Sequence, residues 1–431
     1  MDREARSPGL GPVRQRRPAQ DQQAGAAEGG GEAEGRGPVP PELARHIRRI
    51  VGELKIHQAE RSWAAEVVND FREHLMRFLR SNNDQPLFQS AELLTTGSYF
   101  EKVKIHSPDE FDMMLKLQVP PPFDTTRLDG GLFYRLDLKR PTRLPIKHLL
   151  LENRLTLSSS KILSEMYSLV RKFLKTYKAP DKHCRWEVNK KRIYCPAVTL
   201  SLCRSDNNEL ISVDVVPALE AQAWPPVVRN GPEVDNWLGK KSWRISFSHI
   251  EKKIITSHGN KKTCCERNGT KCCRKQCLML LKCLIASLKL HFPVELEPLC
   301  SYHGKTTFLH TLTERYDDAD WTRPQLPACF LILVSALQDY VRRGNLPHFF
   351  VPECNLFSQA LFPRKARDFL TNALEEQMVE GLPLLKPPAP VSFLETAAFA
   401  KETTSENQLE KSSLVTKMRN KLIWVVIVAL A

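Results

Sequence analysis

Apolar residues recur at a helical spacing in the first part of the chain that shows any periodicity. From Pro41 to Leu79 they return every three or four positions. This spacing gathers apolar side chains on one face of a helix, so we expect a long helix that buries that face. The residues that keep the period are Leu43, Ile47, Ile50, Val51, Leu54, Trp63, Val67, Val68, Phe71, Leu75, Phe78 and Leu79.

Two later stretches alternate apolar and polar residues, as half-buried strands do. They are residues 111–118 and 210–216. Side chains two apart on a strand share a face, so Glu110 and Asp112 project together, opposite the apolar row of the first strand. Asp214 lies on the polar face of the second strand. The pattern therefore predicts three carboxylates on the polar faces of two strands.

The remaining pattern predicts strands in the first half of the chain and helices in the second. Strands are expected at Leu132–Leu138 and Val198–Leu202, and Ser158–Ser160 can cap a helix between them. Strands followed by a run of helices indicate an α+β fold, a mixed α/β domain with a helical second half. The helical runs of the second half are Cys277–Leu290, Phe330–Val341 and Leu356–Leu374.

Both ends of the chain lack this periodicity. Residues 1–40 are rich in Gly, Ala, Pro, Gln and Arg, which predicts a disordered basic tail that either touches phosphates weakly or is inert. At the other end, Leu422–Ala431 is apolar but only ten residues long, whereas a membrane span needs ~20. We therefore expect no transmembrane span. Weak contact with a membrane surface, or an unrelated disordered or short apolar tail, remain as alternatives.

Charge and cysteine content narrow the class of protein. The chain holds 63 Lys and Arg against 49 Asp and Glu, a net charge of +14, which favours a polyanionic partner although many basic proteins bind no nucleic acid. Twelve cysteines are present without a secretory signal before them. That combination favours a reducing compartment and a metal site over a framework of disulfides.

The three carboxylates are suited to divalent cations. Glu110 and Asp112 repel each other unless cations lie between them, and hard oxygen ligands suit Mg²⁺. Just upstream, Gly97 and Ser98 offer backbone N–H groups and a hydroxyl to a triphosphate. Each acid taken alone is more simply a solvated charge at the end of a strand. Their combination favours a metal-dependent active site: a Gly-Ser pair is followed by Glu-x-Asp and then by a distant Asp in an apolar strand.

A cluster of metal-ligand residues lies near the middle of the chain. His258, Cys264, Cys265 and Cys272 follow the spacing H-x5-C-C-x6-C. Zn²⁺ takes four nitrogen or sulfur ligands, and a closed set of four is structural. The alternative is a group of free buried thiols. Lysines and arginines surround this cluster, as expected of a loop that contacts phosphates without reading sequence.

The order of these features resembles the nucleotidyltransferase superfamily. Longer strings resemble, within it, the vertebrate cyclic GMP-AMP synthase family of cytosolic DNA sensors, over about residues 42–380. These strings are Thr96–Glu101 (TGSYFE), Asp109–Asp112 (DEFD), Pro196–Leu200 (PAVTL), Ile211–Asp214 (ISVD), Ser246–Lys252 (SFSHIEK) and His258–Cys277 (HGNKKTCCERNGTKCCRKQC).

The resemblance implies a bilobal architecture. Residues 1–40 would be the disordered tail, and 41–240 would hold a long spine helix and a catalytic lobe with a twisted, mostly antiparallel sheet. Residues 241–385 would form a helical lobe with a zinc thumb at 258–277. Residues 386–431 do not resemble the family.

The resemblance also implies an activity and its partners. Double-stranded DNA would activate the synthesis of 2′–5′/3′–5′ cyclic GMP-AMP from ATP and GTP, an innate immune and antiviral messenger read by the receptor STING. Two Mg²⁺ ions, or Mn²⁺, would be held by Glu110, Asp112 and Asp214, and one structural Zn²⁺ by the thumb. The protein would form a homodimer on DNA in the cytosol and also in the nucleus.

Further site residues come from the resemblance alone. The nucleotide-binding positions would be Gly97, Ser98, Arg244, Ser248, Glu251, Lys282, Ser301 and Tyr302, with the tyrosine stacking on a base. The DNA-binding positions would be Lys55, Lys252, Lys262, Lys271 and Lys275. Lys262 and Glu266 would also lie where two protomers meet.

The chain departs from the family at several places. Gln58 stands where relatives often carry Arg, and Val216 stands where a Thr helps to select guanine. Between Lys241 and Ser242 the chain is shorter than its relatives by roughly two dozen residues, including a strand. Two alternatives therefore stay open: an RNA-activated relative making oligoadenylate or another cyclic dinucleotide, and a catalytically impaired DNA-binding isoform.

Overall fold

The computed structural model describes residues 38–119, 122–129, 131–142, 145–191, 195–221, 228–230, 242–258, 271–387 and 426–429 of the 431-residue chain. The helices and strands below all belong to one compact unit, Val39–Ala431. The helices are α1 (Pro41–Glu53), α2 (Gln58–Ser81), α3 (Pro86–Gln89), α4 (Gly97–Phe100), α5 (Ser159–Leu174), α6 (Ser248–Thr256), α7 (Arg274–His291), α8 (Ser301–Glu314), α9 (Leu326–Arg343) and α10 (Arg364–Val379), with 3₁₀ turns η1 (Lys147–Leu149), η2 (Asp318–Trp321) and η3 (Arg323–Gln325). The strands are β1 (Glu92–Thr96), β2 (Glu110–Leu117), β3 (Phe123–Asp129), β4 (Phe133–Leu138), β5 (Cys184–Val188), β6 (Val198–Arg204), β7 (Glu209–Ala221), β8 (Val228–Asn230), β9 (Trp243–Ser246), β10 (Pro347–His348), β11 (Val351–Asn355) and β12 (Val426–Ala429).

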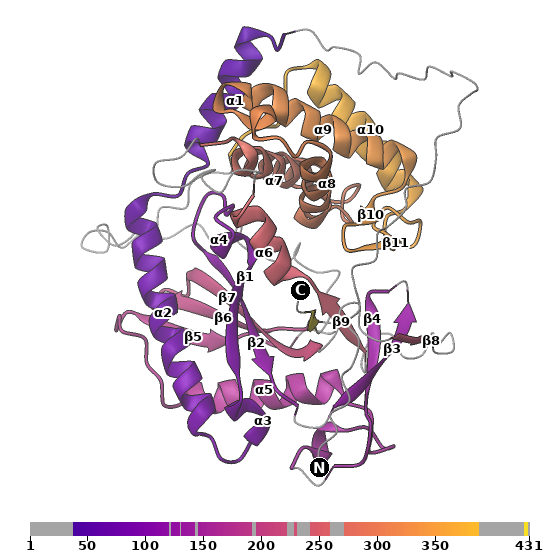
Figure 1. The fold of residues 1–431 in the computed structure, drawn as a ribbon. Helices are drawn as coiled ribbons and strands as arrows, with labels where there is room; N and C mark the ends of the chain where they lie inside the picture. The colour runs from indigo at the N-terminus through magenta and orange to yellow at the C-terminus, as the bar shows by residue number, and fades with distance from the viewer. Residues whose placement is uncertain are drawn as a thin grey trace, which may run out of the picture. The chain divides into compact units, whose positions relative to one another are not determined.

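The strands, apart from the small β10–β11 pair, form one mixed sheet. Its order is β1-β2-β7-β12-β9-β4-β3-β8, and β6 pairs with β7 and carries β5 (Figure 1). The pairs β1–β2, β3–β4, β4–β9, β5–β6 and β6–β7 are antiparallel. The pairs β2–β7, β7–β12, β9–β12 and β3–β8 are parallel. The α+β fold class is thus confirmed, with more parallel pairing than expected.

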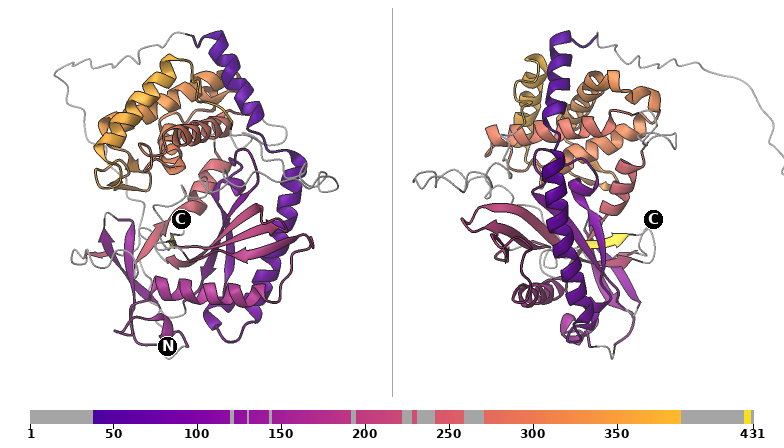
Figure 2. Two further views of the ribbon diagram at one scale, coloured as in Figure 1. Left: turned by 180° about the vertical axis from the view of Figure 1, so that it is seen from behind. Right: turned by 90° about the vertical axis from the view of Figure 1, so that its left-hand side faces the viewer.

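The expected helix from Pro41 is present as two helices that serve two different cores. α1 packs against α7 and α9, and its buried side chains, including Ile47 and Ile50, join the core of the helical half. α2 packs against α3 and α5, and its buried face, including Phe71 and Leu75, joins the core around the sheet. The helix ends after Glu53 because the chain crosses there from one core to the other (Figure 2).

The C-terminal tail contributes a strand to the sheet. Residues 386–431 were expected to be disordered or a short apolar segment, and most of them lie outside the described residues. Val426–Ala429, however, forms β12 between β7 and β9. Across the described residues, none of the helices combines the length and the hydropathy that crossing a membrane would require.

An aromatic cluster anchors α2 and α5 to the sheet. The Phe71 ring lies 5.8 Å from that of Phe173, 5.9 Å from that of Tyr177 and 4.4 Å from that of Trp186, and the Phe71 side chain is fully buried. Aromatic pairs at these distances stabilise a core beyond the area that they bury.

We predict that Phe71→Ala lowers the free energy of unfolding by about 3–5 kcal/mol, because a cavity replaces the ring at the centre of this cluster. Urea unfolding followed by tryptophan fluorescence measures the change. Arg45→Ala, at an exposed position on α1, serves as the control and should change stability by less than about 0.5 kcal/mol. An equal effect of the two substitutions would contradict the assignment of Phe71 to the core.

Candidate active site, zinc site and basic surface

The pairing of β2 with β7 brings two of the expected carboxylates together. The strands are parallel, and their register places Asp112 opposite Asp214 and Glu110 opposite Ser212. Side chains at paired positions of neighbouring strands project from the same face of a sheet. The alternation in the sequence therefore predicted the correct face for each acid, and the register supplies their proximity.

Gly97 closes one side of this acidic site. It begins α4 directly after β1, and β1 pairs with β2 so that Thr96 stands opposite Asp112. The φ angle of Gly97 is +79°, in the left-handed region that favours glycine. A Cβ added at this position would collide with the Asp112 carboxylate. The Gly-Ser pair of the sequence thus lies beside the carboxylates, as a phosphate-binding turn requires.

Burial and neighbouring charges both act on Asp112. Burial is the larger cause and the negative charges of Glu110 and Asp214 the next; against the opposing effects of Lys104 and Lys305, they raise the pKa of the Asp112 carboxyl to about 7. Lys104 Nζ lies 3.0 Å from Glu110 Oε2 and also 3.0 Å from Asp109 Oδ1. The two lysines that act on Asp112 thus do not return its pKa to the ordinary value.

The donor set is chemically suited to a divalent cation. Glu110, Asp112 and Asp214 offer hard oxygen atoms, and the burial and negative charges that raise the pKa of Asp112 are effects that a bound cation would oppose. Thr199 Oγ1 donates to Asp214 Oδ1 at 2.6 Å and so orients that acid. Among the described residues, no three acidic, histidine or cysteine side chains are already grouped closely enough to hold a metal ion.

A second network joins the two halves of the structure beside these acids. Lys305 on α8 places Nζ 2.8 Å from Glu101 Oε1 and 3.1 Å from Glu251 Oε2. Both carboxylates are buried, and Glu101 is 0% exposed. Burial lowers the pKa of Lys305, but attraction by Glu251 and Glu101 outweighs burial and leaves that pKa above its ordinary value. The lysine is therefore held as a cation between two acids of the catalytic side.

Tyr302 extends this network. Its hydroxyl donates to Glu251 Oε1 at 3.0 Å and accepts from His348 Nε2 at 2.9 Å. The Phe350 N–H donates to the other ring nitrogen of His348, which assigns the proton to Nε2. Burial raises the pKa of Tyr302 well above its ordinary value, with Glu251 adding to the rise and Arg244 opposing it. Three expected nucleotide-binding residues, Arg244, Glu251 and Tyr302, thus act on one another.

The other expected nucleotide-binding residues lie around the same region. Lys282 Nζ donates to the Val103 carbonyl oxygen at 3.0 Å, and burial, with repulsion from Lys104 and Lys305, lowers its pKa to about 7. Ser248 is the first residue of α6, and its hydroxyl accepts a hydrogen bond from Ser246. Ser301 is exposed at the first position of α8.

Four residues of the site were missed from the sequence. They are Glu101, Lys104, Thr199 and Lys305. Lys104 pairs with Glu110, Thr199 orients Asp214, and Lys305 pairs with Glu251 and with Glu101. Three of them lie inside or directly beside the strings that carry the resemblance. Lys305 has a weaker signal, its place one helical turn after Tyr302 on an otherwise uncharged helix face.

Comparison with known proteins places this site in a family. Residues 99–242 match the Mab-21 protein nucleotidyltransferase domain, and residues 273–376 match the Mab-21 protein HhH/H2TH-like domain. The chain is 37% identical over 366 residues to a cyclic GMP-AMP synthase of Mus musculus, covering 78% of this chain and 70% of that protein. The chain belongs to the cyclic GMP-AMP synthase family.

Further relatives show the breadth of the similarity. The chain is 36% identical over 412 residues to the cyclic GMP-AMP synthase of Sus scrofa, covering 89% of this chain and 78% of that protein. It is 26% identical over 364 residues to a cyclic GMP-AMP synthase-like receptor of Magallana gigas, covering 78% of this chain and 58% of that protein. The cyclic GMP-AMP synthase family consists of nucleotidyltransferases, which use divalent metal ions.

Two of the four expected zinc ligands, His258 and Cys272, are among the described residues, and their geometry is suited to a shared Zn²⁺. His258 Nε2 lies 3.1 Å from Cys272 Sγ, and two ligands of one tetrahedral Zn²⁺ are about 3.6 Å apart. His258 Nδ1 lies 2.7 Å from the Ile255 carbonyl oxygen, so Nδ1 carries the proton and Nε2 is left to bind a metal. Cys264 and Cys265 lie outside the described residues. The pair His258 and Cys272 thus fits a Zn²⁺ site, whose full ligand set stays a prediction.

The expected DNA-binding lysines differ in their surroundings. Lys55 and Lys271 are exposed, and Lys275 is half-buried on the first turn of α7. Lys252 is half-buried: its Nζ donates to the Thr95 carbonyl oxygen at 2.8 Å and to Thr95 Oγ1 at 3.0 Å. Lys262, together with the expected dimer residue Glu266, lies outside the described residues.

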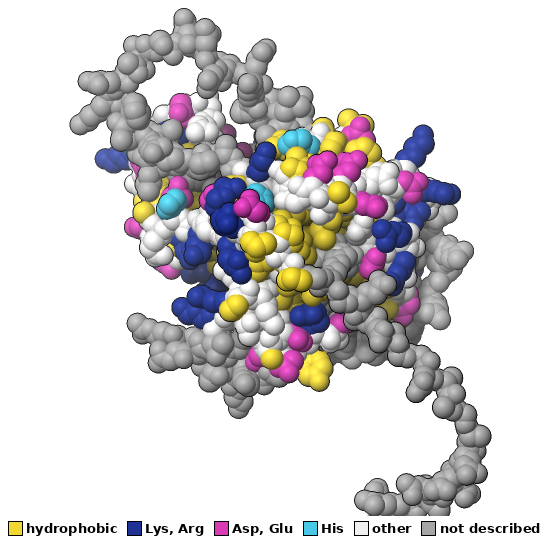
Figure 3. All heavy atoms as spheres, turned by 90° about the horizontal axis from the view of Figure 1, so that it is seen from above, with side chains coloured by type: hydrophobic (Ala, Val, Ile, Leu, Met, Phe, Trp, Pro, Cys, Tyr) yellow, Lys and Arg dark blue, Asp and Glu magenta, His cyan; other side chains and the backbone are white. Residues whose placement is uncertain are grey.

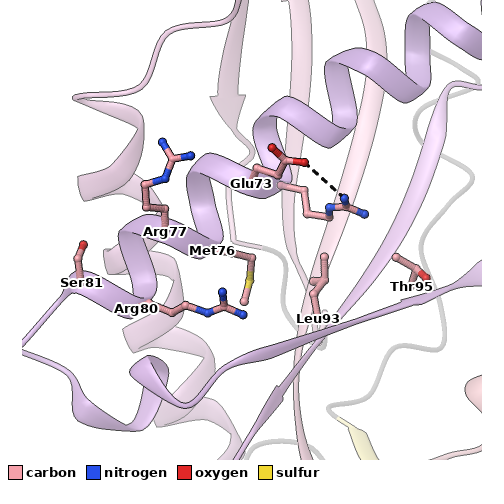
Figure 4. Close-up of a pocket in the computed structure, with 8 residues that line it drawn as sticks. Glu73, Met76, Arg77, Arg80, Ser81, Leu93 and Thr95 are labelled. Atoms are coloured by element: carbon pink, nitrogen blue, oxygen red, sulfur yellow. Dashed lines mark ion pairs between the residues drawn. The ribbon is translucent and has the colours of Figure 1, made fainter.

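An arginine-lined groove lies between α2 and β1, on the same edge as Lys252. Its volume is about 730 Å³, and Arg72, Arg77 and Arg80 from α2 line it with Thr95 of β1 (Figure 4). Arg72 is 3.8 Å from Glu73, which only partly offsets the positive charge. On the face seen in Figure 3, by contrast, lysine and arginine side chains are scattered among acidic and apolar ones. This groove, which we call the α2 groove, was not predicted from the sequence.

We predict that Asp112→Asn stabilises the metal-free protein above pH 7 while it abolishes activity. The folded protein binds the Asp112 proton more tightly than the unfolded chain does, so stability is lost as the pH rises from the ordinary aspartate range to about 7, and the loss is nearly complete at pH 8. The neutral amide removes that repulsion, and we expect about 1–3 kcal/mol more stability at pH 8.

Thermal unfolding in EDTA measures this difference, which should shrink as the pH falls from 8 to 5 because wild-type Asp112 then becomes protonated. Asp339→Asn, a surface carboxylate paired with Arg342, is the control and should show no such dependence. If Asp112→Asn were destabilising at pH 8, the charge crowding at this site would be refuted.

Proposed function

We propose that this protein is a double-stranded-DNA-activated cyclic GMP-AMP synthase that uses ATP, GTP and divalent cations. The observation that carries the proposal is the parallel register of β2 and β7, which sets Asp112 opposite Asp214 with Gly97 against Asp112. Phosphoryl transfer depends mainly on positioning and charge neutralisation: this arrangement would position the triphosphate, and the cations that it would hold would neutralise the charge. The relatives named cyclic GMP-AMP synthase support the product and the nucleotide substrates.

In this proposal each residue has a defined task. Glu110, Asp112 and Asp214 would hold Mg²⁺ or Mn²⁺, which neutralises the developing charge on the phosphates. Asp214, oriented by Thr199, would direct the attacking ribose hydroxyl. The Gly97 and Ser98 turn would bind the triphosphate. Tyr302 would stack on a base, with Arg244, Ser248, Glu251, Lys282 and Ser301 around the two nucleotides.

The contact of Lys252 with Thr95 supports activation by a polyanion. Lys252 follows Glu251 on α6, and its Nζ donates to Thr95 near the end of β1, two residues before Gly97. Thr95 also lines the α2 groove. A phosphate backbone bound in this groove would compete for Lys252 and act directly on the turn beside Asp112. DNA binding and the catalytic turn would thus share one lysine.

The proposed partners and location follow from the same family membership. The product would be read by STING, and two protomers would assemble on DNA through the thumb, with Lys262 and Glu266 at their contact. We propose the cytosol and the nucleus as its locations.

One assay separates this function from its alternatives. The chain is incubated with ATP, GTP and Mg²⁺ without polymer, with duplex DNA or with duplex RNA, and the products are separated by chromatography. Cyclic product with DNA alone supports the proposal. Product with RNA alone would instead identify an RNA-activated relative, and DNA binding without product would identify a catalytically impaired isoform.

We predict that Gly97→Ala reduces product formation by roughly 10²-fold or more, because the new Cβ displaces Asp112 from its place. The same variant should bind duplex DNA as tightly as wild type, which fluorescence anisotropy can measure. Gly52→Ala is a matched glycine control, since a Cβ there meets nothing within 4 Å. Full activity of Gly97→Ala would refute the proposed role of the Gly97 and Ser98 turn in the mechanism.

We predict that the double variant Arg77→Ala/Arg80→Ala weakens duplex DNA binding and reduces its salt dependence. For each phosphate that the protein no longer neutralises, the slope of log K against log salt becomes shallower by about 0.9, so we expect a change of about 1–2. Anisotropy titrations across a series of salt concentrations measure the slope. Arg342→Ala/Arg364→Ala, which removes two exposed arginines from α9 and α10, should leave it unchanged. Equal slopes for all three proteins would exclude the α2 groove from DNA binding.

A further inference from the structure

The C-terminal strand β12 occupies a slot inside the main sheet. Val426–Ala429 pairs in parallel with Ala218–Ala221 of β7. On its other side, Val426–Val428 pairs in parallel with Arg244–Ser246 of β9. β12, drawn in yellow, therefore lies between the strand that carries Asp214 and the strand that carries Arg244 (Figures 1 and 2).

The spacing of strands explains why this slot needs an occupant. Neighbouring strands lie about 4.8 Å apart, so β7 and β9 are separated by about 9.6 Å, too far for direct hydrogen bonds. Within the described part of the sheet, the other neighbour of β9 is β4, which it meets at Phe133 and Tyr134. Without β12, the facing edges of β7 and β9 would both present unpaired backbone groups. Among the described strands, β12 alone links the β9-β4-β3-β8 part to the part that bears the carboxylates.

The sequence of the tail is suited to this slot. Ile423–Leu430 is uncharged and rich in β-branched residues, which favour strands. A near-continuous apolar run is typical of a strand that is buried in a parallel sheet. The flanking residues Ala218, Leu219 and Ile245 are themselves buried. The connection through residues 388–425 is long, but the entropy of closing a loop grows only slowly with its length.

We propose that the C-terminal segment is a sheet-completing strand, which enters the slot between β7 and β9 and thereby positions β9 and α6 against the carboxylates. The pairing itself concerns the fold alone. Its effect on activity rests on the proposed function, because β9 carries Arg244 and leads directly into α6 with Ser248 and Glu251. The tail would thus be a structural part of the catalytic lobe.

Hydrogen–deuterium exchange tests the pairing without reference to activity. A chain truncated after Arg419 is compared with the full chain. We expect faster exchange in segments 218–221 and 244–246, and a melting temperature lower by about 4 °C or more. A synthetic peptide of residues 420–431, added to the truncated chain, should restore both. Unchanged exchange in the two segments after truncation would overturn the proposal.

Two single proline substitutions, compared with each other, test the pairing even if the truncated chain fails to fold. Val428→Pro removes a backbone N–H from a strand that is paired on both sides, where proline is not accommodated. It should reproduce the faster exchange of 218–221 and 244–246. Ser412→Pro, in the same tail outside β12, is the matched control and should leave exchange unchanged. Identical exchange in the two proline variants would also overturn the proposal.

DNA-stimulated product formation is measured on the same proteins. We expect Val428→Pro to lower it by about tenfold or more, because a displaced β9 misplaces Arg244 and α6. Faster exchange with full product formation would retain the strand and refute its positioning role. Absence of product from the wild-type chain as well would refute the proposed synthase function, while the exchange result would still decide whether β12 completes the sheet.

Discussion

The crowding of half-buried carboxylates on β2 and β7 is the constraint on which the rest of the structure depends. Parallel pairing sets Asp112 opposite Asp214, and Glu110 adds a third charge two residues away. A sheet would not gather these charges for stability, since burial and mutual repulsion raise the pKa of Asp112 to about 7. The surrounding structure must therefore hold the strands together against this repulsion, and a cation would relieve it.

Much of the compensating structure is a set of lysines placed between acids. Lys104 contacts Glu110 and Asp109, and Lys305 lies between Glu101 and Glu251. The Lys305 pairs are buried, and removing one partner of a buried pair typically costs about 3–5 kcal/mol, because the remaining charge is left uncompensated. Lys305 comes from the helical half and both of its acids come from the sheet side. The junction between the two cores is thus electrostatic as well as apolar.

How far the sequence predicted this site depended on the range of each interaction. Alternation alone placed Glu110 and Asp112 on one face, because a strand has a period of two. Helical periodicity found α1, α2, α7 and α9, but it missed α6 and α8, and the run expected from Leu356 is helical only from Arg364. It could not reveal the break at residues 54–57. Before this break Ile47 and Ile50 pack in one core, and after it Phe71 packs in the other. Lys305 escaped for a similar reason, since its acids are distant in sequence and only the fold brings them together.

The pairing of β12 also could not be predicted from local sequence patterns, because its partner strands are far away in the sequence. Its apolar sequence indicated either a tail or a surface segment, because no local signal names β7 and β9 as partners. Val426 pairs with Ala218, which lies near the middle of the chain. Contacts between residues this far apart in sequence close a large loop and therefore form more slowly than local ones. Until β12 pairs, residues 218–221 of β7 and 244–246 of β9 have no strand between them, so the strand that carries Asp214 depends on a distant segment to join it to the strand that carries Arg244.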